Sequence, residues 1–227
     1  MSSNRFELRM MAVVAALGTT VPFAASAQTV VYNNTTGVST GMHVSNVEYG
    51  DEITLAGSLR TATQFSFNYF SNYDLSGGGV LRIYANDGPL VSGSPAPKEV
   101  LYQSAPFDIV KSNVSDPNNA QGSMVTINLS STGLVVPNKV TWTVSFSSVG
   151  GANTAGLLVY GGPTTGTSKE DFWKKTAGTW SLQLLDNNVS ANFGAKLTAI
   201  PEPSTYALAG VGAIGWLALA GYRRSKK

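Results

Sequence analysis

His43 is the only histidine of this 227-residue chain, and the chain has no cysteine. A thiolate nucleophile, a disulfide framework and a zinc site built from Cys or from several His are therefore excluded. His43 falls in the segment Met42-His43-Val44-Ser45, which is predicted to be a strand. We expect a half-buried structural histidine at this position rather than a general base.

Pairs of carboxylates could hydrolyse glycosidic bonds, a reaction that needs two acids on opposite sides of the scissile bond. The candidates are Glu48, Asp51, Glu52, Glu99, Asp108, Glu170 and Asp171. All but Asp108 lie near predicted turns or strand ends, where solvated acids are ordinary, and spacing alone does not pair them. We therefore expect no catalytic residues and no enzyme.

Ligand-binding residues are few. Asp74, Asp87 and Asp116 lie in predicted loops and could offer oxygen ligands to Ca²⁺, but no DxDxDG loop is present and Asx turns explain the same residues. We expect no metal and no cofactor. Trp173 and Trp180 could form a sugar-stacking platform, since aromatic faces match the CH face of a pyranose; alternatively they close one end of the core around Gly178.

The net positive charge of the chain comes from its two ends. Residues 28–200 hold nine Lys/Arg against eleven Asp/Glu, whereas residues 201–227 hold four against one. Only 12% of all residues are charged, about half the ~25% of an ordinary soluble domain. No basic face remains to neutralise phosphates, so we expect no nucleic-acid partner.

The elements that must position these residues are strands. Apolar and polar side chains alternate between residues 28 and 199, for example in Phe65, Phe67 and Tyr69, and Gly-, Pro- and Asn-rich turns separate the runs. This pattern predicts an all-β domain, an antiparallel two-sheet sandwich that is jelly-roll-like. Strands are expected at residues 29–32, 42–48, 52–56, 64–69, 80–85, 99–103, 107–110, 124–129, 134–136, 140–147, 156–160, 180–185 and 193–198.

The clearest alternating run is 140–147. Trp142 shares a face with Val140, Val144 and Phe146, and we expect this face to pack against Phe65 and Phe67 of the opposing sheet. Thr141 and Thr143 are then predicted to lie on a wet outer face.

The first residues read as a secretory signal peptide, residues 1–27. Arg5 and Arg9 form a basic segment, residues 10–17 are a short apolar core, and Ala25-Ser26-Ala27 is a small-x-small cleavage site. We expect cleavage between Ala27 and Gln28. The apolar core is too short to span a membrane comfortably.

The last residues combine three parts. The segment Pro201-Glu202-Pro203-Ser204-Thr205 precedes an uncharged apolar run that ends at Tyr222, and a basic tail follows. The 18 residues 205–222 would span about 27 Å as a helix, close to the thickness of the hydrocarbon core. The tail should act as a stop-transfer signal that stays cytoplasmic and leaves the body outside; it consists of Arg223, Arg224, Lys226 and Lys227.

This ending, residues 200–227, resembles the PEP-CTERM sorting signal of exopolysaccharide-producing Gram-negative bacteria. The tripeptide of that signal is intact as Pro201, Glu202 and Pro203, while Ile200 stands where Val is commoner and Tyr206 where Trp is common. The resemblance implies recognition by an exosortase, a membrane protease-transpeptidase that cuts near the tripeptide. An ordinary C-terminal anchor is the alternative, but an anchor does not require the tripeptide.

Two functions follow for the sandwich of residues 28–199. In the first, it is a non-enzymatic protein of the cell surface or extracellular matrix, passed through the secretion translocon, held transiently in the inner membrane, and associated with exopolysaccharide or biofilm. In the second, it is a carbohydrate-binding or glycoside-cleaving domain that acts on the same extracellular polysaccharide. The absence of a catalytic signature favours the first.

Overall fold

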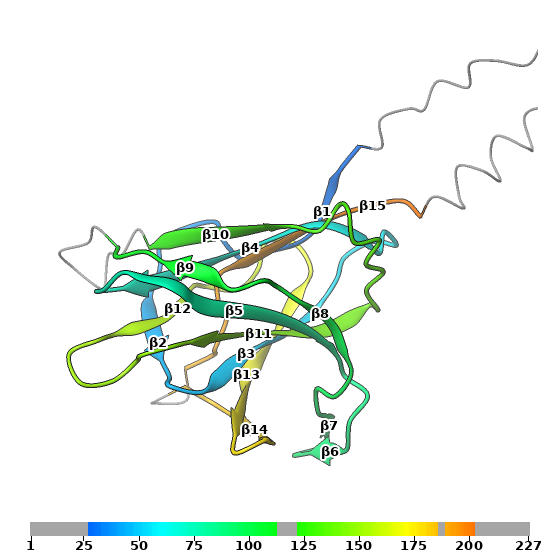
Figure 1. Cartoon of the computed structure of the whole chain (residues 1–227). Helices are drawn as coiled ribbons and strands as arrows, with labels where there is room; N and C mark the ends of the chain where they lie inside the picture. The colour runs from blue at the N-terminus through cyan, green and yellow to red at the C-terminus, as the bar shows by residue number, and fades with distance from the viewer. Residues whose placement is uncertain (1–26, 113–121, 186–188, 203–227) are drawn as a thin grey trace, which may run out of the picture.

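The computed structural model describes residues 27–112, 122–185 and 189–202, and these residues form strands and no helix (Figure 1). All pairings between neighbouring strands are antiparallel. Alternating side chains favour this arrangement because each strand can turn one apolar face towards a shared core. The all-β, antiparallel sandwich predicted from the alternation is confirmed at this level.

Sheet A has the order β1-β15-β4-β12-β2, and β10 also pairs with β4. Sheet B has the order β14-β13-β3-β11-β5-β8, and β9 also pairs with β5. The strands of sheet A are β1 (Thr29–Asn33), β2 (Gly41–Val44), β4 (Thr61–Ser71), β10 (Ser123–Asn128), β12 (Ala155–Val159) and β15 (Ala195–Ile200). Those of sheet B are β3 (Glu48–Thr54), β5 (Leu75–Ala85), β8 (Val100–Gln103), β9 (Phe107–Ile109), β11 (Lys139–Phe146), β13 (Thr167–Thr176) and β14 (Thr179–Gln183). A small hairpin joins β6 (Leu90–Val91) to β7 (Ser94–Pro95).

The core lies between the two sheets and centres on Trp142 of β11. The Trp142 ring centroid lies 5.3 Å from that of Phe65 and 5.8 Å from that of Phe67, both on β4 of the opposite sheet. Phe193 adds an edge contact at 6.5 Å. The predicted packing of Trp142 on Phe65 and Phe67 is therefore confirmed.

Most expected strands are present, but several differ. The expected strand 42–48 is interrupted at residues 45–47, where the chain passes from β2 in sheet A to β3 in sheet B, and the short strands β6 and β7 were not expected. Residues 134–136 do not form a strand; only Val135 bridges to Thr61. Conversely, the ten-residue strand β13 pairs with both β3 and β14, although no strand was expected between residues 161 and 179. Its sequence TSKEDFWKKT is so polar that it shows no clear alternation of polar and apolar residues. Such a segment can still form a strand, because the apolar stems of its lysines can cover apolar neighbours while their charges remain near water.

The predicted wet face of β11 is wrong. Thr141 and Thr143 are both 0% exposed, as is Trp142 on the other face. β11 lies in the middle of sheet B, between β3 and β5, and the side chains of Glu48 in β3 and Asn86 just after β5 lie over its outer face. Sheet B is thus covered on both sides at this strand.

Candidate functional sites

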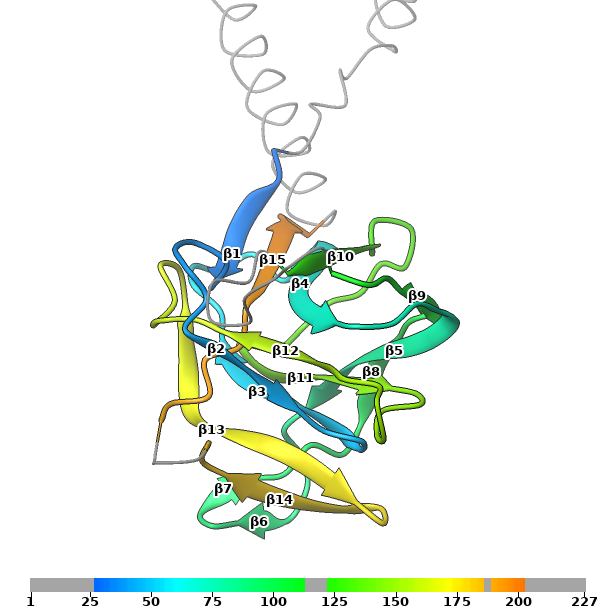
Figure 2. The same ribbon diagram turned by 90° about the vertical axis from the view of Figure 1, so that its left-hand side faces the viewer.

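The two ends of the described body lie side by side in sheet A. β1 pairs with β15 so that Thr29 stands opposite Ala199 (Figure 2). Ala27 and Gln28, the predicted cleavage site of the signal peptide, are exposed just before β1. A protein processed at both ends would therefore be cut twice at the same end of its sandwich.

The sorting tripeptide begins directly after an interior strand of sheet A. β15 lies between β1 and β4, and its last residue, Ile200, pairs with Thr61. Pro201 is half-buried and Glu202 is exposed. Proline cannot donate a hydrogen bond to a continuing ladder, so it is suited to end β15 here. The remaining predicted sorting residues lie outside the described residues: Pro203, Ser204, Thr205, Arg223, Arg224, Lys226 and Lys227.

Within the described parts of the chain, no helix is long and apolar enough to cross a membrane. The predicted span, residues 205–222, lies outside these parts, as do residues 1–26 of the predicted signal peptide.

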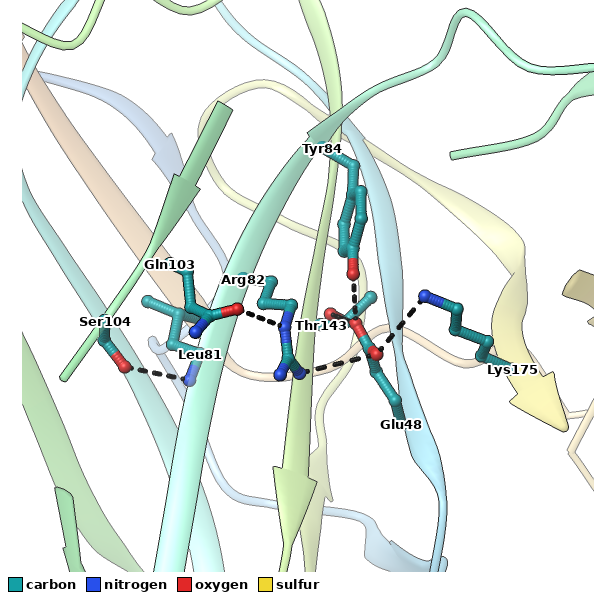
Figure 3. Close-up of polar contacts among 8 residues, drawn as sticks. All are labelled: Glu48, Leu81, Arg82, Tyr84, Gln103, Ser104, Thr143 and Lys175. Atoms are coloured by element: carbon teal, nitrogen blue, oxygen red, sulfur yellow. Dashed lines mark hydrogen bonds and ion pairs between the residues drawn. The ribbon is translucent and has the colours of Figure 1, made fainter. Parts of the chain in front are cut away.

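A polar cluster on the outer face of sheet B centres on Glu48 (Figure 3). Its Oε1 accepts hydrogen bonds from the hydroxyls of Tyr84 and Thr143, both at 2.7 Å. Its Oε2 lies 3.4 Å from Arg82 Nη1 and 3.8 Å from Lys175 Nζ. We call these five residues the Glu48 cluster.

The Glu48 cluster joins four neighbouring strands. Its members come from β13, β3, β11 and β5, which are adjacent in that order. Arg82 Nε extends it to β8 by donating to Gln103 Oε1 at 2.8 Å. Charge-assisted hydrogen bonds of this kind hold a carboxylate that is largely removed from water. The cluster therefore acts as a cross-link over the outer face.

Aromatic rings close the cluster on one side. Lys175 Nζ lies 5.1 Å from the Trp180 ring centroid and 5.6 Å from that of Tyr84, so its charge faces both π-systems. The Tyr84 and Trp180 rings meet edge to face at 5.4 Å. Burial, and then the neighbouring Glu48 carboxylate, raise the pKa of the Tyr84 phenol above its usual range.

Trp173 and Trp180 meet edge to face at 6.4 Å, but the sugar platform considered from sequence is not formed. Trp173 is fully buried, and its Nε1 donates to Glu52 Oε2 at 3.2 Å. A sugar has no access to that ring. Trp180 is half-buried against Tyr84, so the pair serves packing, which was the alternative drawn from the sequence.

Two acids of β3, Asp51 and Glu52, are buried rather than solvated, which corrects the expectation for them. Asp51 is 0% exposed on the inner face, and its Oδ2 accepts a hydrogen bond from Ser168 Oγ at 2.6 Å. Burial raises the pKa of the Asp51 carboxyl well above its usual range, and the Ser168 hydrogen bond opposes this shift. Glu52 is buried on the outer face, where Lys139 Nζ lies 3.1 Å from its Oε1.

The acids of β3 are held by separate partners. Glu48 and Glu52 share one face of β3, but their Cα atoms are four residues, or about 13 Å, apart along the strand. Asp51 points to the opposite face. Each of the three carboxylates also has structural partners already.

His43 lies in β2 and is half-buried, as expected. Its ring centroid lies 4.7 Å from that of Phe172 and 5.3 Å from that of Tyr49. Residues 37–41 also form a G-x-S-x-G pattern centred on Ser39, which was not among the sequence-based candidates. A nucleophile elbow needs an exposed serine between a strand and a helix. Ser39 is instead buried, precedes β2, and donates to the carbonyls of Gly41 and Val159 at 2.9 and 3.2 Å.

The loop acids considered as calcium ligands cap backbone groups. Asp74 accepts from the Lys111 N–H at 2.8 Å and Asp87 from the Glu99 N–H at 3.0 Å, while Asp116 lies outside the described residues. No group of three or more His, Asp or Glu side chains in the described ranges could hold a metal ion.

Comparison with known proteins concerns the end of the chain. Residues 199–224 match the family model of the PEP-CTERM protein-sorting motif, so the match begins inside β15. No curated protein and no solved structure matches the chain. The resemblance found in the sequence is thereby confirmed: the chain carries a PEP-CTERM sorting motif at residues 199–224, which indicates exosortase-dependent sorting to the cell surface.

Proposed function

We propose that the chain is a non-enzymatic protein of the cell surface or extracellular matrix, associated with exopolysaccharide or biofilm. The observation that carries this proposal is the sorting motif at residues 199–224. The signal peptide delivers the chain to the translocon, residues 205–222 hold a transient precursor in the inner membrane, and the exosortase acts near Pro201–Pro203. The body of residues 28–199 then remains outside.

The position of the motif supports this order of events. Because β1 and β15 are neighbours, both ends of the body can face the membrane while the rest of the sandwich extends away from it. The exposed Glu202 follows the last strand by two residues, so this residue of the tripeptide is accessible to a membrane enzyme without opening the sheet.

The contacts of the polar side chains support a non-enzymatic role. Glu48 and Glu52 serve cross-links on the outer face, and the hydrogen bonds of Ser39 Oγ go to backbone groups of Gly41 and Val159. We also propose that the sandwich is jelly-roll-like, because the chain repeatedly crosses between the sheets, from β3 to β4 to β5 and from β10 through β13.

Replacement of Pro201, Glu202 and Pro203 by Ala tests the sorting step. We expect the variant to be exported but retained in the membrane fraction, because the apolar run and basic tail are unchanged. The matched control replaces Pro106, Pro137 and Glu99, which are exposed elsewhere on the body, and should be released like the wild type. Fractionation that showed normal release of the tripeptide variant would reject exosortase processing at this site.

A second pair of assays tests the role of the released protein. We expect the exported protein to liberate no reducing sugar from the exopolysaccharide of its producing cells, while a glycan array reports whether it binds that polymer. Release of reducing sugar that is lost on Glu48→Gln or Glu52→Gln would contradict the non-enzymatic role and favour a glycoside-cleaving domain.

A further inference from the structure

One margin of sheet A is an edge strand of regular geometry. Among the described residues β10 pairs with β4 alone, in unbroken register from Ser123 opposite Tyr69 to Asn128 opposite Gln64. The register contains no bulge. A regular edge of this kind presents a row of backbone donors and acceptors to whatever lies beside it.

The phase of the hydrogen bonds identifies the outward groups. The Leu129 N–H donates to the Thr63 carbonyl at 2.8 Å, directly after the β10–β4 ladder. Hydrogen-bonded pairs alternate in an antiparallel ladder, so Ile127 and Val125 also bond to β4. The N–H and C=O groups of Met124, Thr126 and Asn128 therefore point away from β4, and their side chains are exposed.

This margin lacks the features that usually prevent edges from pairing. No charged residue and no proline occurs between residues 122 and 136. Three exposed apolar side chains lie along this edge of sheet A. Met124 is 63% exposed in β10, and Val110 (52%) and Val135 (51%) lie beside the two ends of β4. By contrast, β1 is flanked by Thr164 and Thr165, which hydrogen-bond to Asn33.

We propose that β10 pairs antiparallel with β10 of a second copy of this chain, about a two-fold axis at Thr126. The backbone groups that point away from β4 fit this axis. Thr126 would exchange both backbone hydrogen bonds with Thr126 of the partner copy, and the backbone of Met124 would bond to that of Asn128 of the partner copy. An uncharged strand does not repel its own copy, whereas a strand with net charge would. The same patch on both copies closes a two-fold dimer and joins the two A sheets into one.

The absence of native cysteine gives a direct test. Thr126→Cys in the full-length chain, expressed and exported by its producing cells, would place two Cys opposite each other, about 5.5 Å apart between Cα atoms, which a disulfide can bridge. Leu90→Cys, at an apolar position 72% exposed on the β6–β7 hairpin, is the matched control. On non-reducing electrophoresis we expect at least about tenfold more cross-linked dimer for Thr126→Cys, because pairing holds its sulfurs together.

Two further variants check the register. Met124→Cys alone should cross-link no better than Leu90→Cys, since its sulfurs would lie about 13 Å apart or more. Met124→Cys combined with Asn128→Cys should cross-link well. Export and thiol labelling of each variant after reduction confirm that it folds and is accessible. If Thr126→Cys yields no more cross-linked dimer than Leu90→Cys, the pairing of two β10 strands is refuted. If Met124→Cys alone cross-links as well as Thr126→Cys, the two-fold axis at Thr126 is refuted.

Discussion

Replacement of Thr143 by Val tests the view that the outer face of sheet B is packed. Valine keeps the branched shape of threonine, and therefore its volume and strand preference, but it removes the hydroxyl that donates to Glu48 Oε1 at 2.7 Å. The side chain is fully buried, so water cannot replace the lost donor directly. Glu48 keeps Tyr84, Arg82 and Lys175 as partners.

The expected cost follows from these contacts. A hydrogen bond to a charged group contributes about 1.5–3 kcal/mol. Because three partners remain and Glu48 is 12% exposed, we expect the lower part of that range, about 1.5–2 kcal/mol. For a domain of this size the loss lowers Tm by about 3–8 °C, which thermal unfolding followed by circular dichroism resolves.

Two controls make the outcome decisive. Thr176→Val changes an exposed threonine at the end of β13 and should alter the free energy of unfolding by less than about 0.5 kcal/mol. In a Glu48→Ala background Thr143→Val should lose most of its effect, because its acceptor is gone. If Thr143→Val is as neutral as Thr176→Val in the wild-type background, the Glu48 cluster does not stabilise the sheet and the reasoning fails.

Three further outcomes are expected. Trp142→Ala should destabilise the body by about 3–5 kcal/mol, or about 6–20 °C in Tm, whereas Trp142→Phe keeps a ring against Phe65 and should cost clearly less in the same thermal assay. Asp51→Asn should flatten the pH dependence of stability. Burial raises the pKa of the folded Asp51 carboxyl above 3.8. The protonated carboxyl therefore stabilises the fold in acid, and this stabilisation is lost as pH rises through the folded pKa. Between pH 4 and pH 8 the Tm of the Asn variant should therefore rise relative to the Tm of the wild type. Equal slopes of Tm against pH for the two proteins would contradict the burial of Asp51.

The sequence predicted those parts of the fold that alternation encodes. The run from Val140 to Phe146 carries large apolar residues at every second position, and both its strand and its packing on Phe65 and Phe67 are confirmed. The sorting motif was equally readable, because its parts follow one another along the chain and need no tertiary contact.

Alternation could not predict what covers the second face of a strand. Thr143 looks solvent-facing in the sequence, yet Glu48, 95 residues away, folds over it. Strand β13 was missed for a related reason: Lys174 and Lys175 look like loop residues until Tyr84 and Glu48 are seen beside the second of them. The Glu48 cluster could have been suspected only from the i, i+4 spacing of Glu48 and Glu52 on one face of a strand with buried Tyr49 and Ile53 on the other.

The place of β15 links folding to sorting. This strand lies between β1 and β4, so β1 can join sheet A only after residues 195–200 have paired with β4. These residues directly precede the tripeptide. During synthesis the chain emerges N-terminus first, so β1 can pair only after β15, about 165 residues later, has emerged, and a long loop must then close. The motif match itself begins at residue 199, within β15. Two roles therefore meet in Ala199 and Ile200: they complete the sheet, and they begin the segment that directs the folded body to the surface.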